Sequence, residues 1–357
     1  MTKETALITG AAGFLGSHLV DSFLAKGHQV VGVDNLSHGS LDNLREAQQS
    51  PGFDFHQIDV RDLDALRTVA HGVSVIAHLA AYKIPRYGKA IDTLLINSQG
   101  SHNALQVAVE NNAKFVLAST SDVYGKNPDI PFSEESNSVL GPSTIARWSY
   151  AVSKLYDEHL ALAFADAYGI EVNVVRIFGS YGPRQNLTWW GGPQSVFIGA
   201  ILAGEAIPIH GDGQQTRSFT YVSDTVGGII SVMEKGEGGE IFNIGSTEEI
   251  GIANLARMIH RLSGSKLPLN LEFIPYDKIS GKRYEDVQRR VPNTSKAHSL
   301  LGFEAKVSLE EGLTRTIEWQ RSLQPVGHPL RARQGPWVVL AAGRAKSSRP
   351  ALWPDGE

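Results

Sequence analysis

The sequence predicts an α/β protein in which a doubly wound parallel sheet carries a second, smaller α/β lobe. In the first half, short β-branched runs alternate with segments of helical spacing, which is typical of a parallel sheet covered by helices on both faces. Near Phe178 this alternation weakens, and shorter strands follow. The chain of 357 residues is long enough for two packed units with a large core.

Each strand expected in the first half is a short apolar run bounded by helical or loop segments. These strands are 4–10, 29–34, 53–59, 73–80, 114–120 and 171–178. In the second half, the expected strands are 207–213, 217–223, 240–245 and 269–276, and the expected helices are 224–235, 252–262 and 308–320.

The chain divides into a cofactor-binding domain at 1–180, a substrate-binding lobe at 181–325 and a flexible tail at 326–357. The tail is rich in Arg, Ala, Pro and Gly and has little periodicity, so we expect it to stay flexible. Lobes of this kind often return strands to the main sheet, so strands after residue 180 can still belong to the first domain.

Composition and charge exclude several classes of protein. A net charge of −4, without a basic block in the main body, does not suggest nucleic-acid binding. The absence of cysteine excludes disulfides and thiolate–metal sites, and we expect no metal. No uncharged apolar run approaches the ~20 residues of a membrane span. The N-terminus has no signal-peptide pattern, so we expect a cytoplasmic protein that does not bind membranes.

A glycine-rich turn lies between the first expected strand and the first helix. Gly10 permits the tight turn, Gly13 lets the backbone approach a pyrophosphate, and Gly16 lets helix and strand pack closely. The helix that starts at Phe14 and Leu15 offers its N-terminal amides to the same phosphates. A tight turn without a ligand is the alternative, but the position of the turn favours a Rossmann-type dinucleotide site.

Carboxylates end the next two expected strands. Asp34 can accept both hydroxyls of an adenosine ribose and would repel a 2′-phosphate, which favours NAD over NADP. A turn or capping role is the alternative for Asp34 alone, and it loses weight beside the glycines. Asp59 lies either at the adenine edge or as a cap of the helix at Leu63. The neighbours Asn35 and Val60 complete the expected contacts here.

Tyr150 and Lys154 are four residues apart at the start of a long helical segment, so they share one helix face. An ammonium group stabilises a phenolate and lowers the tyrosine pKa from ~10 towards neutral. Tyr150 can then take a proton from a substrate hydroxyl while hydride leaves the same carbon. An exposed helix pair is the alternative for this pattern in isolation, and the dinucleotide turn favours the catalytic interpretation.

Several motifs occur in a family-specific order. Together they resemble the extended short-chain dehydrogenase/reductases, and more specifically the NAD-dependent nucleotide-sugar epimerases, dehydratases and decarboxylases. The resemblance covers roughly residues 4–323 and rests on TGAAGFLG, VDNLS, HLAA, STSDVYG, YAVSK, RIFGSYGPRQ and RSFTYVSD.

This resemblance implies roles around the catalytic pair. Tyr150 is similar to the catalytic base, Lys154 to the partner that also holds the nicotinamide ribose, and Thr120 to the hydroxyl bridging the sugar and Tyr150. Ser121 and Asp122 complete the catalytic segment. Further cofactor contacts are implied for Ala80, Ala81, Lys83 and Asn97, although Asn97 can instead bond locally within its helix.

The resemblance also implies a nucleotide-sugar substrate, which we expect to be UDP-linked. Arg217 and Arg283 resemble arginines that clamp its diphosphate, because a planar guanidinium donates two bonds at once. A surface salt bridge is the alternative for either arginine. Gly179 stands where the family often has Asn, so the missing contact is expected from a backbone amide, Gln185 or Asn186. Other expected substrate contacts are Arg86, Phe178, Arg184 and Val196.

Asp122 decides which reaction we expect. Dehydratases of this family usually carry Thr-Asp-Glu and uronate decarboxylases Thr-Ser-Glu, whereas this chain has Thr120-Ser121-Asp122. The aspartate carboxylate falls more than ~1 Å short of the reach of glutamate, which is unfavourable for proton transfer. We therefore expect 4-epimerisation through a 4-keto sugar, with UDP-glucuronate decarboxylation or dehydration as alternatives. Arg86 or Arg184 would hold a uronate carboxylate.

Two further expectations concern function as a whole. A non-catalytic NAD-binding regulator is the alternative of another class, and the presence of both Tyr150 and Lys154 weighs against it. The segments 88–111 and 145–168 carry apolar side chains on more than one face. In the family, the equivalent helices pair across a two-fold axis, so the resemblance implies a homodimer.

Overall fold

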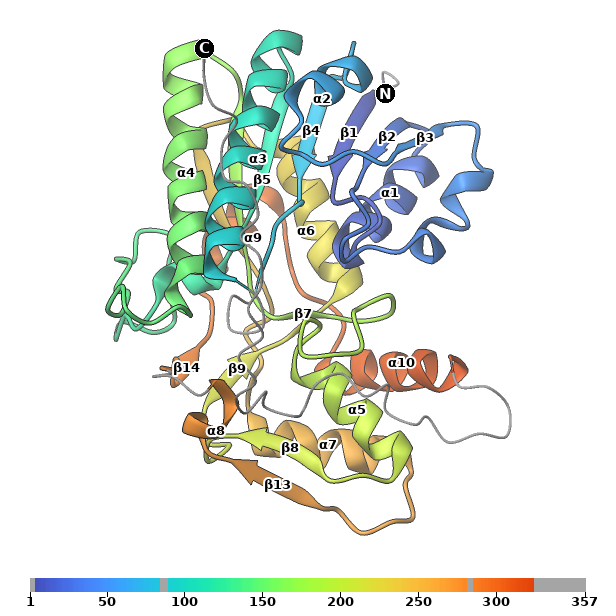
Figure 1. The fold of residues 1–357 in the computed structure, drawn as a ribbon, viewed down its shortest axis with the longest axis vertical. Helices are drawn as coiled ribbons and strands as arrows, with labels where there is room; N and C mark the ends of the chain where they lie inside the picture. The colour runs from blue at the N-terminus through green and yellow to red at the C-terminus, as the bar shows by residue number, and fades with distance from the viewer. Residues whose placement is uncertain (1–3, 84–88, 281–284, 324–357) are drawn as a thin grey trace, which may run out of the picture.

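A seven-stranded parallel sheet forms the upper part of the molecule, which confirms the predicted fold class (Figure 1). The computed structural model describes residues 4–83, 89–280 and 285–323, so the expected tail at 326–357 lies outside the described residues. In spatial order the strands are β11 (Glu240–Ile244), β6 (Val172–Ile177), β5 (Lys114–Thr120), β4 (Val75–His78), β1 (Thr5–Thr9), β2 (Gln29–Val33) and β3 (Phe53–His56).

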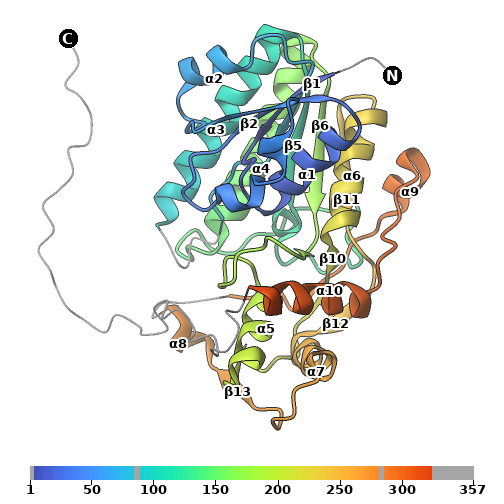
Figure 2. The ribbon, with the colours of Figure 1, turned by 90° about the vertical axis from the view of Figure 1, so that its right-hand side faces the viewer.

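Helices cover both faces of this sheet (Figure 2). One face carries α1 (Phe14–Ala25) and α6 (Val222–Lys235), and the other carries α2 (Leu63–Val69), α3 (Ala90–Asn111) and α4 (Trp148–Tyr168). In β1, Ala6 and Ile8 join the first core while Leu7 joins the second, because successive strand side chains point to opposite faces. Burial on both faces explains why the strands read as continuous apolar runs.

The smaller lobe lies below the sheet in Figure 1 and is built from short strands and helices. Its strand pairs are β7 (Ser180–Tyr181) with β10 (Thr220–Tyr221), and β8 (Ile207–His210) with β13 (Leu271–Ile274). A third sheet holds β12 (Glu249–Gly251), β9 (Thr216–Ser218) and β14 (Arg289–Arg290). The helices are α5 (Pro193–Ala203), α7 (Ile252–Ser263), α8 (Tyr276–Ser280) and α10 (Leu309–Ser322).

The chain returns twice from the smaller lobe to the sheet. After β10 it returns to form α6 and β11, which pairs with β6 at the sheet edge, and α9 (Ser295–Leu301) also packs on α6 and β11. Residues 222–244 therefore belong with the first sheet, although the boundary at 180 assigns them to the second lobe. The core around α1 and α6 continues without a break into α5, α7 and α10.

Short 3-10 segments follow β2 and β5, and the carboxyl ends of the strands lie together at one edge of the sheet. The segments are η1 (Leu41–Leu44), η2 (Ala47–Gln49) and η3 (Ser121–Tyr124), and η3 directly follows β5. Because the strands are parallel, the carboxyl ends of β1, β2, β4, β5 and β6 meet at one edge, facing the smaller lobe. Within the described ranges, no helix is long and apolar enough to cross a membrane.

Candidate active site

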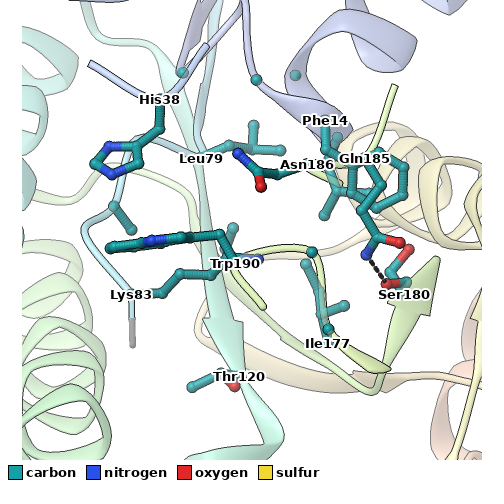
Figure 3. A pocket seen from close by; sticks show the side chains of 18 of the residues that line it. Phe14, His38, Leu79, Lys83, Thr120, Ile177, Ser180, Gln185, Asn186 and Trp190 are labelled. Atoms are coloured by element: carbon teal, nitrogen blue, oxygen red, sulfur yellow. Dashed lines mark hydrogen bonds between the residues drawn. The ribbon is translucent and has the colours of Figure 1, made fainter. Parts of the chain in front are cut away.

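One large pocket lies between this edge of the sheet and the smaller lobe, with a volume of about 830 Å³ (Figure 3). Its walls include the glycine turn after β1 and the strand ends of β2, β4 and β5. From the smaller lobe come the segment between β7 and α5 and the strand β9. A ligand in this pocket would therefore touch both parts of the protein.

The glycine turn has the geometry that a dinucleotide site needs. Gly10 has a φ of +71°, and a Cβ at this position would lie 2.9 Å from the backbone nitrogen of Ala80. A Cβ on Gly16 would lie only 2.0 Å from the carbonyl oxygen of Gly10. Gly13 precedes α1 without a side-chain cap, so the first amides of that helix remain available to phosphate oxygens. Gly10, Gly13, Phe14, Leu15 and Gly16 all line the pocket.

Asp34 lies just beyond β2 and is held by the backbone. One carboxylate oxygen accepts from the amide of Ala12 (3.1 Å) and the other from the amide of Leu36 (2.7 Å). Burial raises the pKa of Asp34, and these two hydrogen bonds oppose the rise. The remaining lone pairs can accept ribose hydroxyls, as the sequence predicts.

The neighbours of Asp34 divide into two groups. Asn35 and Val60 line the pocket, whereas Asp59 is held outside it by Asn35 (3.0 Å) and by a pair of bonds from Arg61. The alternative role of Asp59 as cap of α2 is filled instead by Asp62, whose carboxylate accepts from the amide of Ala65 (3.1 Å). Asp59 therefore contacts the pocket-lining Asn35 and does not line the pocket itself.

The segment after β4 forms the next part of the wall. Ala80, Ala81 and Lys83 line the pocket. Asn97 does not line it: its side-chain oxygen accepts from the amide of Tyr82 (2.7 Å), and its nitrogen donates to the hydroxyl of Ser153 (2.9 Å). Asn97 thus fixes the backbone that presents Lys83 and ties α3 to α4.

Three aromatic rings pack together beside this wall. Trp190, from the segment before α5, lies with its ring centroid 4.3 Å from that of His38 and 5.2 Å from that of Tyr82. In Figure 3 the indole of Trp190 crosses the pocket between His38 and Lys83. The three rings therefore join the turn after β2, the turn after β4 and the smaller lobe.

Tyr150 and Thr120 meet at the far end of the pocket, as the sequence predicts. Both line it, and the Thr120 hydroxyl is hydrogen-bonded to the Tyr150 phenol. Burial raises the pKa of Tyr150 above its ordinary value, and the carboxylate of Asp122 raises it further. The chain alone therefore keeps Tyr150 protonated, so phenolate formation needs added positive charge in the pocket.

Lys154 lies on the next turn of α4 but does not reach the pocket surface. It is 1% exposed, and its ammonium pairs with the carboxylate of Asp157 at 3.0 Å. Ser121 is likewise buried and outside the pocket wall, and Tyr124 packs on Phe132 with its hydroxyl donating to Asn243 (2.7 Å). Tyr124 is thus a packing neighbour.

A network of charges surrounds Asp122 beside Tyr150. Arg290 donates a hydrogen bond to the Asp122 carboxylate, and Arg147 lies 3.6 Å from the same oxygen. Arg147 also pairs with Asp286 at 3.4 Å, and Asp286 accepts from Arg217 at 2.9 Å. Three guanidinium groups thus face two carboxylates, and all five side chains line the pocket.

This network shifts the ionisation of its buried members. Burial lowers the pKa of Arg217 to about 10, and the carboxylate of Asp286 opposes that shift. Burial works against ionisation of Asp286, but the charges of Arg217 and Arg147 lower its pKa below the ordinary value. Arg217 is therefore positioned at the pocket wall by Asp286 before any substrate phosphate arrives.

The other residues expected to bind substrate are not grouped around Tyr150. The Arg184 guanidinium lines the pocket but pairs with Asp21 of α1 at 2.6 Å, so it is directed towards α1. Phe178 is fully buried against Tyr124, and Val196 is buried in α5; neither belongs to the pocket wall. Arg86 and Arg283 lie outside the described residues.

Gly179 has a structural reason to lack a side chain. Its φ is +47°, and a Cβ would lie 2.3 Å from the carbonyl oxygen of Ser218. Gln185, one expected substitute for the missing contact, donates to the carbonyl of Ser180 (3.0 Å) and accepts from Ser195 (3.3 Å). Gln185 and Asn186 both line the pocket, where Figure 3 shows Gln185 beside Ser180.

Sequence reasoning missed Arg147, Asp286 and Arg290. Arg147 had a local signal, because it stands three residues before Tyr150 at the start of the catalytic helix. Arg290 and Asp286 had none, since Arg290 reaches Asp122 across 168 positions of sequence. The family resemblance instead implied Arg283, seven positions before Arg290.

Comparison with known proteins identifies the family. A model of the GDP-mannose 4,6-dehydratase family matches residues 7–316. The chain belongs to this family. The UDP-N-acetyl-alpha-D-glucosaminuronate decarboxylase of Bacillus cytotoxicus is 37% identical over 324 residues, covering 90% of this chain and 99% of that protein. UDP-glucuronic acid decarboxylase 1 of Xenopus tropicalis is 36% identical, covering 89% of this chain and 72% of that protein.

Solved structures of nucleotide-sugar enzymes share the fold. The UDP-glucuronic acid 4-epimerase of Bacillus cereus, in complex with UDP-glucuronic acid and NAD, superposes with a TM-score of 0.80. It is 29% identical, and the match covers 90% of this chain and all of that one. The predicted resemblance to nucleotide-sugar epimerases and dehydratases is confirmed, and NAD is the cofactor of the family.

The described residues fit this cofactor. The free amides at the start of α1 and the closely approached glycines suit its pyrophosphate, and the Asp34 carboxylate suits an unphosphorylated adenosine ribose. Tyr150 and Thr120 line the same pocket as the glycine turn. The family is enzymatic, so the regulator alternative gains no support.

Proposed function

We propose that this protein is an NAD-dependent decarboxylase of a UDP-hexuronate. The observation that carries the proposal is the convergence of Arg147 and Arg290 on Asp122, directly beside Tyr150. Guanidinium groups at the catalytic end suit a sugar whose C6 is a carboxylate, because their planar donors match carboxylate oxygens. A hexose with a neutral C6 hydroxymethyl group offers these guanidinium groups no negative charge to pair with.

The balance of charge supports an anionic sugar. Arg147, Arg217 and Arg290 outnumber Asp122 and Asp286, so the cluster carries a net positive charge. Arg217 lies on β9 in the smaller lobe and lines the pocket, and we assign it to the substrate diphosphate. That leaves Arg147 and Arg290 for the sugar, since both contact Asp122.

The relatives support the same choice. Two relatives that match nearly the whole described chain are named as decarboxylases of UDP-linked uronates. The expectation of epimerisation rested on the short reach of Asp122, yet Asp122 is engaged by two arginines and holds them at the pocket. A shorter carboxylate can serve this purpose without transferring a proton itself.

The reaction begins with removal of the sugar O4 proton by Tyr150, with Thr120 orienting both groups. NAD, when bound, would accept hydride from C4 and return it later. Oxidation of C4 makes the uronate a β-keto acid, so the C5–C6 bond breaks, CO2 leaves, and the electron pair moves into the C4 carbonyl as an enolate. Tyr150 and Thr120 face this oxygen and stabilise its charge by hydrogen bonding. A proton from solvent water would then add at C5, and Tyr150 would return its own proton to O4 as C4 is reduced again, which restores the base and the cofactor.

Epimerisation of the same uronate at C4 is the second candidate. It is favoured by one observation, the aspartate in place of glutamate at position 122, and by the likeness to a UDP-glucuronic acid 4-epimerase. Both candidates share the first oxidation and the carboxylate contacts. They differ in two respects. Decarboxylation releases CO2 before C4 is reduced, whereas epimerisation keeps the carboxylate and requires the keto sugar to turn over, so that C4 is reduced from its other face.

A product assay separates the two. The holoenzyme is incubated with UDP-glucuronate and the products are followed by mass spectrometry and proton NMR. Decarboxylation predicts a UDP-sugar lighter by the mass of CO2, and epimerisation predicts an isomer of unchanged mass. Turnover of UDP-glucose at a rate equal to UDP-glucuronate would contradict both, because neither arginine would then matter.

A further inference from the structure

The catalytic helix carries an acid that the reaction does not use. Tyr150, Lys154 and Asp157 lie on successive turns of α4, and the Lys154 ammonium pairs with one oxygen of Asp157 at 3.0 Å. Lys154 is 1% exposed and Asp157 is fully buried. The second oxygen of Asp157 is buried and has no hydrogen-bond partner among the described residues.

No other carboxylate of the described residues shares this ammonium. Glu158, the next residue, is engaged by Arg176 of β6 (2.7 Å) and by Ser119 of β5. His78 of β4 also faces Lys154, but burial lowers the pKa of His78 to about 3 and the lysine charge lowers it further. His78 is therefore neutral at working pH, and Asp157 alone balances the charge of Lys154.

Stability is a weak explanation for this pair. Removing two charges from water costs free energy that their attraction repays only partly, so a buried ion pair often stabilises a fold no more than apolar side chains would. The unpartnered oxygen of Asp157 adds a further cost. A costly charge one turn beyond a catalytic lysine instead suggests a role in the chemistry.

The charges around Tyr150 show what that role would be. Asp122 of η3 and Asp157 both raise the pKa of the phenol, whereas Arg290 of β14 and the Thr120 hydrogen bond lower it, all against a larger rise from burial. By pairing with Asp157, Lys154 loses much of the field that would stabilise a phenolate at Tyr150.

We propose that Asp157 is a positioning residue that holds the Lys154 ammonium and sets the pH at which Tyr150 ionises. This inference rests on the proposed use of Tyr150 as the base, which decarboxylation and epimerisation share. Asp157 adds to the effect of burial and of Asp122 in keeping the phenol protonated in the empty site, so that the positive charge of bound oxidised cofactor has the larger effect. The base is then active chiefly when the hydride acceptor is present.

The test is a titration of the Tyr150 phenol in the NAD-loaded holoenzyme. The absorbance of tyrosinate is followed against pH, and the signal of Tyr150→Phe is subtracted to isolate this one phenol. We expect Asp157→Asn to move the midpoint to lower pH, by about half a unit or more. The direction follows because loss of a negative charge, and release of the lysine field, both favour phenolate.

Matched variants keep the test decisive. Asp157→Glu keeps the charge and should titrate close to the wild type, and Asp157→Ser should repeat the shift of Asp157→Asn if the amide prevents folding. A midpoint that stays unchanged in a folded charge-removing variant would overturn the proposal. A loss of thermal stability without a shifted midpoint would give Asp157 a structural role only.

The titration needs no substrate, so it is independent of the reaction assigned above. If UDP-glucuronate is not decarboxylated but the midpoint moves, the proposed function fails and the role of Asp157 stands. If decarboxylation is found and the midpoint does not move, the role of Asp157 fails alone. With a substrate in hand, the acid limb of the kcat/KM profile should move in the same direction.

Discussion

The two ends of the pocket are built in opposite ways. At the cofactor end, glycines, backbone amides and one carboxylate do the work, and the partners are close in sequence: Asp34 binds the amide of Ala12 across 22 positions. At the catalytic end, five charged side chains meet from α4, η3, β9, β14 and its preceding segment, and Asp122 reaches Arg290 across 168 positions.

This difference separates what is general in the protein from what is specific. The glycine turn and the first amides of α1, which we call the cradle, suit the pyrophosphate that every protein with this cofactor must bind. In the proposed function, the charged side chains at the other end recognise the carboxylate attached to the sugar. In this interpretation, the specificity for one sugar and one reaction comes from the charged end of the pocket. The cradle contributes only the binding of the redox cofactor.

The largest effect is expected from Tyr150→Phe, which removes the base at the charged end but leaves the cradle intact. Turnover of UDP-glucuronate should fall by about 10²–10⁴-fold, the usual contribution of general acid–base catalysis. The NAD content of the purified protein should stay the same. Tyr124→Phe is the matched control, because that phenol donates to Asn243 in the packed core beside the site, and its loss should leave turnover nearly unchanged.

Arg290→Met tests whether the charged end reads the sugar carboxylate. We expect kcat/KM for UDP-glucuronate to fall about 10- to 100-fold, the value of one hydrogen bond between charged groups. Binding of UDP-glucose, measured by calorimetry, should change little. Arg289→Met is the control, since the neighbouring guanidinium pairs with Glu249 at 2.7 Å and lies outside the pocket wall. Equal losses in the two variants would leave Arg290 without a special role.

Gly16→Ala tests the other end. The added Cβ would lie 2.0 Å from a backbone oxygen that cannot move aside, so we expect a loss of about 1–3 kcal/mol in the free energy of unfolding, together with weaker NAD binding. Chemical denaturation measures the first and fluorescence titration the second. Gly227→Ala in α6 meets no atom within 4 Å and should stabilise the protein slightly.

The smallest effect on turnover is expected from substitutions on the exposed surface of α3 and α4, outside both ends of the pocket. Ile91, Leu95 and Tyr156 are about half exposed there, and we propose that a second copy of the chain covers them. Tyr156→Arg should convert the dimer to a monomer in sedimentation and leave kcat within about twofold. Leu300→Arg, an exposed position on α9, is the control. A wild-type monomer at micromolar concentration would contradict the proposed dimer.

The contrast between the two ends also explains how far the sequence could be interpreted. The cradle, Asp34, Thr120 and Tyr150 were predicted in place, because each lies in a short motif whose local geometry follows from residue type. The main sheet was predicted because its buried strands are continuous apolar runs. Arg290 was not, since its approach to Asp122 depends on how the smaller lobe packs against the sheet, and no local pattern encodes that packing.

Two side chains point in other directions than the sequence suggests, and the physical reason is the same for both. Lys154 was expected to act directly on Tyr150, and its buried pairing with Asp157 depends on helix packing around α4 rather than on the Y-x-x-x-K spacing. Arg184 was expected to face the sugar, but Asp21 of α1 binds its guanidinium. In both cases a carboxylate elsewhere in the fold determines where the cation points.

The position of β11 at the sheet edge has a consequence for synthesis of the chain. On the ribosome, β6 is complete long before β11 emerges, and the intervening residues build much of the smaller lobe. Until then, the backbone edge of β6 has no partner on that side and can pair with another nascent chain. A fragment that stops near residue 180 keeps this edge open permanently, so we expect it to aggregate rather than to yield an isolated cofactor-binding domain.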